Sequence, residues 1–163
     1  MNGRVAICPG SYDPVTNGHL DIIGRAARIF DQVVVGVVDQ PLRKQKTLFS
    51  AAERVGFIEE ATSGLDNVSV SVFSNLLVEF AREHGATAIV KGLRAISDFE
   101  YEFELNQLNR KLAPEIESVY VMASAEYSFL SSTGVKEIAT FGGDIGDLVP
   151  SGVAAALRER IER

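Results

Sequence analysis

The chain has 163 residues, of which 46% are hydrophobic and 23% are charged, and its formal net charge is −6. This length predicts one domain over residues 1–163, ending in C-terminal helices. The acidic balance argues against broad nucleic-acid binding, and no apolar run reaches the roughly 18 residues of a membrane span. The single cysteine, Cys8, excludes an internal disulfide framework and a cysteine-based metal site. We expect a cytoplasmic protein that binds neither nucleic acid nor membrane.

Five short runs rich in Val and Ile recur along the chain, at 5–8, 33–38, 68–72, 88–90 and 119–122. Between them, apolar residues return at helical spacing. This alternation is typical of an α/β fold with a doubly wound parallel sheet. We therefore predict a five-stranded, Rossmann-like sheet. The run at 68–72 alternates with serine, which indicates one wetter face.

Several helix boundaries can also be predicted. Thr16 and Ser50 are placed to cap helices, and His84-Gly85 is placed to end one. A long helix is expected around the apolar residues from 99 to 112. After it, residues 131–141 are expected to form another helix, and Pro150 is well placed to open the last one.

In open α/β sheets, ligands bind outside the carboxyl ends of the strands. The segment after the first predicted strand, 9–19, is rich in turn residues and ends in Gly18-His19. The chain contains neither G-x-G-x-x-G nor G-x-x-x-x-G-K-[ST], the two common phosphate-loop motifs. We expect His19, in the first turn of a helix, to donate a hydrogen bond to a phosphate oxygen as charge builds there. The alternative is a polar residue satisfied by local backbone.

Two later segments add groups that suit an anion. Lys91 and Arg94 flank Gly92 after the fourth predicted strand, where a planar guanidinium and a mobile ammonium can hold phosphates. The hydroxyl-rich segment 127–133 precedes a helix, whose free N–H groups bind anions without a charge. The alternatives are a solvated basic turn and ordinary helix capping, respectively.

These three segments carry a family resemblance. Residues 10–19 are similar to the first signature of the nucleotidylyltransferase superfamily, and 91–102 and 127–133 narrow the resemblance to bacterial phosphopantetheine adenylyltransferases. The resemblance spans nearly the whole chain. It implies an enzyme (EC 2.7.7.3) that transfers the adenylyl group of ATP to 4′-phosphopantetheine in coenzyme A biosynthesis, giving dephospho-coenzyme A and pyrophosphate. It also implies in-line attack without a covalent enzyme intermediate, magnesium as cofactor, a homohexamer, and coenzyme A as a feedback inhibitor.

The resemblance also implies site residues. His19 and Ser11 are expected to be catalytic. The expected ATP ligands are Ser11, Tyr12, His19, Gly92, Leu93, Arg94, Glu102, Tyr127, Ser128, Phe129, Leu130, Ser131, Ser132 and Thr133. The expected phosphopantetheine ligands are Ser11, Arg43, Lys44, Leu77 and Lys91. No protein residue is expected to bind metal.

One loop departs from the family pattern. Relatives usually carry lysine two residues after Pro41, whereas this chain has Arg43 there, with Lys44 and Lys46 close behind. Which of the three contacts the pantetheine phosphate stays open. Leu77 is equally open, since a core leucine is as good a reading as a pantetheine contact.

Two other functions are compatible with parts of this pattern. A related nucleotidylyltransferase acting on nicotinate mononucleotide or glycerol 3-phosphate would share the first signature. A nucleotide-binding regulatory module without catalysis is the alternative from another class, and intact His19, Ser11, Lys91 and Arg94 argue against it.

Overall fold

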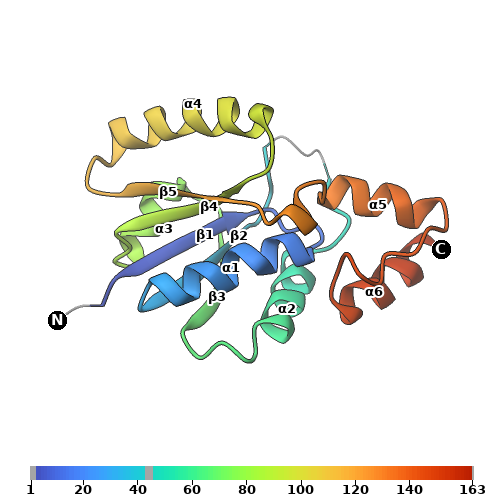
Figure 1. Cartoon of the computed structure of the whole chain (residues 1–163). Coiled ribbons are helices and arrows are strands. Elements are labelled where there is room, and N and C mark those ends of the chain that lie inside the picture. The colour runs from blue at the N-terminus through green and yellow to red at the C-terminus, as the bar shows by residue number, and fades with distance from the viewer. Residues whose placement is uncertain (1–2, 43–45, 163) are drawn as a thin grey trace.

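The computed structural model of the chain describes residues 3–42 and 46–162 and is built on one parallel sheet (Figure 1). Its strands are β1 (Val5–Gly10), β2 (Gln32–Val38), β3 (Val68–Phe73), β4 (Ala88–Leu93) and β5 (Glu117–Met122), in the order β3-β2-β1-β4-β5. Every pairing is parallel. The predicted five-stranded sheet is thus confirmed. The predicted strand that alternates with serine is β3, which lies at one edge of the sheet.

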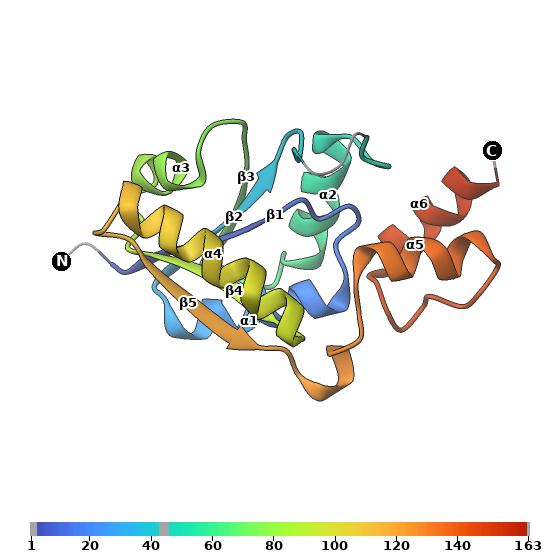
Figure 2. The same cartoon turned by 90° about the horizontal axis from the view of Figure 1, so that it is seen from above.

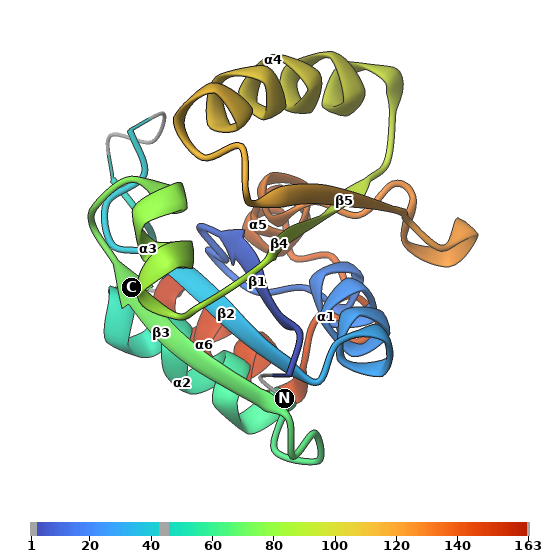
Figure 3. The same cartoon turned by 90° about the vertical axis from the view of Figure 1, so that its left-hand side faces the viewer.

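Helices cover both faces of the sheet (Figure 3). They are α1 (Asn17–Ile29), α2 (Ala51–Ala61), α3 (Leu77–Glu83), α4 (Ile96–Leu112), α5 (Ser132–Thr140) and α6 (Ser151–Ile161), with a short 3₁₀ turn at Ala125–Tyr127. The first core cluster joins α1, α2 and α6 to one face through Ile23, Ile58 and Leu157. The second joins α3 to the other face, where Phe80 packs with Phe73.

The predicted helix boundaries are confirmed by their hydrogen bonds. The hydroxyls of Thr16 and Ser50 accept from the N–H groups of His19 at 3.3 Å and Glu53 at 3.2 Å. Gly85, just past α3, has a φ of +63°, which explains a glycine there. These caps fix where α1 and α2 begin, and α1 begins at the carboxyl edge of the sheet.

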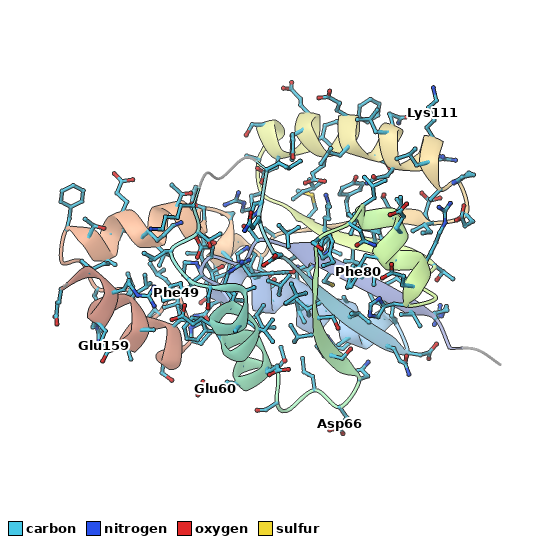
Figure 4. The ribbon with its side chains drawn as sticks, turned by 180° about the vertical axis from the view of Figure 1, so that it is seen from behind. Phe49, Glu60, Asp66, Phe80, Lys111 and Glu159 are labelled. Carbon is cyan, nitrogen blue, oxygen red and sulfur yellow. The ribbon has the colours of Figure 1, made fainter. Side chains whose placement is uncertain are left out.

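Helix α4 forms where it was expected but packs differently from its pattern. Its apolar residues Phe99, Phe103, Leu108 and Leu112 are 52–55% exposed, and none of its described side chains is buried. The helix lies over β4 and β5 (Figure 2), and Lys111 at its end points away from the sheet (Figure 4). The apolar stripe therefore predicts the helix correctly, but its side chains do not pack into the hydrophobic core of the chain.

Two buried charged side chains organise the loops at the carboxyl edge. Asp13 is fully buried, and its carboxylate accepts hydrogen bonds from the N–H groups of Leu48 and Phe49, each at 2.9 Å. Nζ of Lys136, on α5, lies 3.4 Å from the same carboxylate. Asp13 thus ties the β1–α1 loop to residues 48–49 and to α5, and Phe49 lies between α2 and the C-terminal helices (Figure 4).

Arg54 on α2 also ties loops together at the carboxyl edge of the sheet. It is 1% exposed, and its guanidinium donates to four carbonyls, those of Ser11, Val38, Asp39 and Phe49, over 2.7–3.1 Å. Burial lowers the pKa of this guanidinium, and the nearby Asp13 and Asp39 carboxylates oppose that effect. The connection between β2 and α2 contains the basic loop, Arg43 to Lys46. Arg54 holds this connection on both sides of the loop, at the carbonyls of Asp39 and Phe49.

Candidate active site

A cavity of about 390 Å³ opens at the carboxyl ends of β1 and β4. The chain runs from β1 outward in both directions across the sheet, so this is the switch point at which open α/β sheets bind ligands. The start of α1, the end of β4, α4 and residues 123–133 supply the rest of the wall. The cavity therefore gathers three of the segments that the sequence marked as unusual.

His19 lies in this wall, and its tautomer follows from one hydrogen bond. The backbone N–H of Thr16 donates to Nδ1 of His19 over 3.0 Å. A backbone N–H can only donate, so Nδ1 must accept and the neutral ring must carry its proton on Nε2. The contact between Thr16 and His19 therefore places a hydrogen-bond donor at the N-terminal, positive end of α1.

Tyr12 supports the imidazole. Its ring meets that of His19 edge to face, with centroids 5.0 Å apart, and its hydroxyl donates to the carbonyl of Cys8 at 2.9 Å. Tyr12 has a φ of +49°, a conformation that costs free energy in a non-glycine residue and clusters at functional sites. Burial raises the pKa of Tyr12 well above its usual range and that of the Cys8 thiol to about 12, so both side chains stay neutral.

The two predicted phosphate-binding cations both reach α4. Nζ of Lys91 lies 2.8 Å from the Glu102 carboxylate, and Nε of Arg94 lies 3.1 Å from that of Asp98. Arg94 also donates from Nη1 to the carbonyl of Leu130 at 2.7 Å. Arg94 thus bridges the β4–α4 connection and the 123–133 segment across the cavity wall.

The start of α5 forms another part of the cavity wall. Ser131 caps the helix by accepting from Gly134 N–H at 3.0 Å, and the hydroxyl of Ser132 donates to the carbonyl of Pro14 at 2.8 Å. Ser131, Ser132 and Thr133, at the start of this helix, therefore line the same cavity as the start of α1. Two helix N-termini with a histidine and two cations form a site suited to a polyphosphate.

The structure brings most of the predicted residues together. The cavity is lined by Tyr12, His19, Lys91, Gly92, Arg94, Glu102, Tyr127, Leu130, Ser131, Ser132 and Thr133. Five predicted residues lie outside its lining, namely Ser11, Leu77, Leu93, Ser128 and Phe129. Arg43 and Lys44 fall outside the described residues, and Lys46 is exposed.

The residues outside the lining have visible surroundings. Leu93 is 8% exposed and Leu77 packs against the core beneath α3, whereas Phe129 is 94% exposed. The hydroxyl of Ser128 donates to Ala125 within the 3₁₀ turn. The carbonyl of Ser11 is held by Arg54, which leaves its side-chain role as a prediction.

Sequence reasoning missed several residues of the site. Asp98 and Tyr101 line the cavity from α4, and Ile22 lines it from α1. Helical spacing from Glu102 could have pointed to Asp98, since residues four apart share a helix face. Asp13 and Arg54 had no signal, because nothing in a sequence distinguishes a buried charge from a solvated one.

Within the described ranges, no group of three or more His, Cys, Asp or Glu side chains could hold a metal ion. No helix in the described part of the chain is long and apolar enough to cross a membrane.

Comparisons with known proteins agree with this geometry. The cytidylyltransferase-like family matches residues 7–138. A phosphopantetheine adenylyltransferase of Rubrobacter xylanophilus is 58% identical over 160 residues, covering 98% of this chain and 96% of that protein. One of Alkaliphilus metalliredigens is 48% identical over 157 residues, covering 96% and 99%.

A crystal structure from Vibrio parahaemolyticus, assigned provisionally as a nicotinate-nucleotide adenylyltransferase, superposes with a TM-score of 0.73. It covers 99% of this chain and 98% of that one, but at 16% identity it supports the fold alone. The level and extent of identity to the curated relatives are decisive. The chain belongs to the phosphopantetheine adenylyltransferase family, within the cytidylyltransferase-like nucleotidyltransferases.

Proposed function

We propose that the cavity at β1 and β4 performs the reaction of this family, the transfer of the adenylyl group of ATP to 4′-phosphopantetheine. An oxygen of the 4′-phosphate attacks the α-phosphorus of ATP, and the bond from that phosphorus to pyrophosphate breaks in line. The products are dephospho-coenzyme A and pyrophosphate. A phosphate monoester is already anionic near neutral pH, so the attack needs no general base and no covalent enzyme intermediate.

Catalysis then depends on alignment and on stabilising the charge that develops around the α-phosphate. The observation that carries the proposal is the hydrogen bond from Thr16 N–H to Nδ1 of His19. It places the ring proton on Nε2, so we propose that His19 acts as a donor to the transition state and neither as a base nor as a nucleophile. Ser11 is the second predicted group at the α-phosphate.

The remaining lining residues divide between the two substrates. Arg94, Gly92 and the helix start at Ser131–Thr133 suit the ATP phosphates, with Tyr127 and Leu130 beside the nucleoside. Lys91 suits the acceptor phosphate, and the basic loop from Arg43 to Lys46 is the further candidate for that phosphate. Together these cations would offset the repulsion between two anionic substrates.

Magnesium enters this scheme with the substrate. The described residues include no acidic cluster that could form a cage, so Mg²⁺ would arrive bound to ATP and water. It supplies charge neutralisation on the phosphates, while the protein groups supply orientation.

Three further proposals rest on family membership. The chain is expected to assemble as a homohexamer, and the exposed apolar side chains of α4 support self-association. It is expected to be inhibited by coenzyme A, which shares the pantetheine arm, and to work in the cytoplasm. Sedimentation of the purified protein tests the hexamer.

A pyrophosphate-release assay tests the proposed reaction. ATP with 4′-phosphopantetheine is expected to give turnover, while ATP with nicotinate mononucleotide and CTP with glycerol 3-phosphate are expected to give none. Turnover with either alternative pair would reassign the acceptor or the nucleotide. No turnover with any pair would favour a binding module.

A further inference from the structure

Two carboxylates lie in a cavity whose proposed ligands are phosphates. Asp98 and Glu102 are four residues apart on α4, so they share the helix face that meets Arg94 and Lys91. Each cation is therefore paired with a carboxylate. Because like charges repel, an incoming phosphate is opposed by the carboxylates for as long as they stay in place.

The contact between Lys91 and Glu102 is the less exposed of the two ion pairs. The two side chains are 18% and 16% exposed, against 38% and 29% for Arg94 and Asp98. The pair is therefore less screened by solvent. Glu102 also acts on Tyr120. Burial is the main cause of the raised pKa of Tyr120, and the charge of Glu102 is the second cause.

The carboxylate of Glu102 is less firmly hydrogen-bonded than that of Asp13. Its Oε2, although out of solvent and 2.8 Å from Nζ of Lys91, has no hydrogen bond of good geometry. The Asp13 carboxylate differs, because two backbone N–H groups hold it at 2.9 Å. The hydroxyl of Tyr120 donates to the backbone carbonyl of Glu102 at 3.1 Å, which anchors the helix at this residue but leaves the carboxylate to Lys91.

We propose that Glu102 is a displaceable counter-ion of Lys91, which the phosphate of the acceptor substrate must replace. A phosphate monoester carries up to two charges and three acceptor oxygens, so it outcompetes a carboxylate that lacks an aligned hydrogen bond. Glu102 thus competes with anions for Lys91, orients its ammonium group and lowers the affinity of the site for anions. The inference rests on the proposed function in naming the acceptor phosphate as the displacing group.

Glu102→Gln tests this role, with binding measured by isothermal titration using 4′-phosphopantetheine and, separately, inorganic phosphate. The amide keeps the size of the side chain and removes its charge. Both ligands are expected to bind about five- to tenfold more tightly than to the wild type, the effect of freeing one partly buried cation. Glu104→Gln, an exposed change on the same helix, should leave both affinities unchanged.

A double-mutant cycle separates displacement from a general effect on α4. Lys91→Gln should weaken binding, and adding Glu102→Gln to that variant should no longer tighten it. Unchanged or weaker anion binding by Glu102→Gln would overturn the inference, as would tightening that persists without Lys91. If Glu102→Gln fails to fold, as judged by circular dichroism, Glu102→Ala is titrated in its place against the same expectations.

The two probes keep this inference distinct from the proposed function. Tighter binding of inorganic phosphate by Glu102→Gln, with no 4′-phosphopantetheine binding by any variant, would support the counter-ion and remove the proposed acceptor. Binding of both ligands by the wild type, with no gain in the variant, would do the reverse.

Discussion

Nη1 of Arg54 donates to the carbonyl of Ser11 over 2.8 Å, which joins α2 to the loop that precedes the proposed catalytic histidine. Arg54→Leu would leave this carbonyl and three others without their donor in a buried place. We expect the free energy of unfolding to fall by about 3–5 kcal/mol, measured by urea denaturation.

The matched control is Arg82→Leu. Arg82 pairs with Glu115 at 2.6 Å on the surface, with both side chains about half exposed, so its loss should change stability little. A loss in Arg54→Leu no greater than in this control would mean that the buried hydrogen bonds add nothing net.

His19→Ala should lower kcat on the order of 10²–10³-fold, the effect of losing one donor to a charged transition state. Binding of ATP should change far less, because the donor acts on charge that develops only during the reaction. Pyrophosphate release gives the rate, and titration with a non-hydrolysable ATP analogue gives the affinity.

His84→Ala is the control, because His84 contacts the carbonyl of Phe80 at the end of α3 and does not line the cavity. Its turnover should match the wild type. Near-normal turnover in His19→Ala would remove the central role of His19.

Cys8 should make the stability of the protein depend on alkaline pH. Burial raises its thiol pKa from 9.0 to about 12, so the unfolded chain loses the proton at lower pH than the folded one. The stabilising contribution is full below pH 9 and is lost as the pH rises toward 12. Relative to Cys8→Ala, the wild type should lose about 1.4 kcal/mol per pH unit above pH 9.

Urea denaturation of both proteins between pH 7 and pH 10.5 measures this difference. Below pH 8 the difference should be constant, because the thiol keeps its proton in both states. A constant difference over the whole range would show that the thiol ionises equally easily in both states.

Gly92→Ala should push β4 away from α1. A Cβ at position 92 would lie 2.9 Å from Cγ1 of Ile22, which is closer than side chains pack. We expect a loss of about 1–3 kcal/mol in stability, as for overpacking elsewhere, and a lower kcat because α1 carries His19. Adding Ile22→Ala should restore part of both.

The cycle distinguishes packing from ligand contact at Gly92. If packing explains the glycine, the two changes will be strongly non-additive in urea denaturation. Simple additivity would point to a requirement for backbone close to the nucleotide.

The sequence predicted the sheet well because each buried strand is a short run of Val and Ile bounded by turn residues. Tyr12, His19, Lys91 and Arg94 line one cavity because they lie at or just after the carboxyl ends of β1 and β4, which meet at one edge. The motif resemblance added Glu102 and the segment 127–133, although membership of the lining does not test each proposed role.

The sequence could not show which residues contact one another across the fold. Acidic residues at 98, 100, 102 and 104 look alike in a row, and only the position of α4 above β4 turns Asp98 and Glu102 toward cations. The same placement leaves Phe99 and Phe103 half exposed, although their spacing resembles a core-facing stripe. Arg54 likewise becomes a loop anchor only because α2 packs beside the ends of β1 and β2.

Strand β1 begins at Val5, on the N-terminal side of the sheet (Figure 1). The cavity is lined by Cys8 and Pro9, near the other end of this strand. The N-terminal side of β1 is therefore the better place for an affinity tag or biotin, because it lies at the end of the sheet away from the proposed active site. The C-terminal helix is a poorer attachment point, since Arg160 on α6 donates to the carbonyl of Leu48, next to the basic loop. A sensor chip loaded through the N-terminus should present the substrate entrance to the flowing solution.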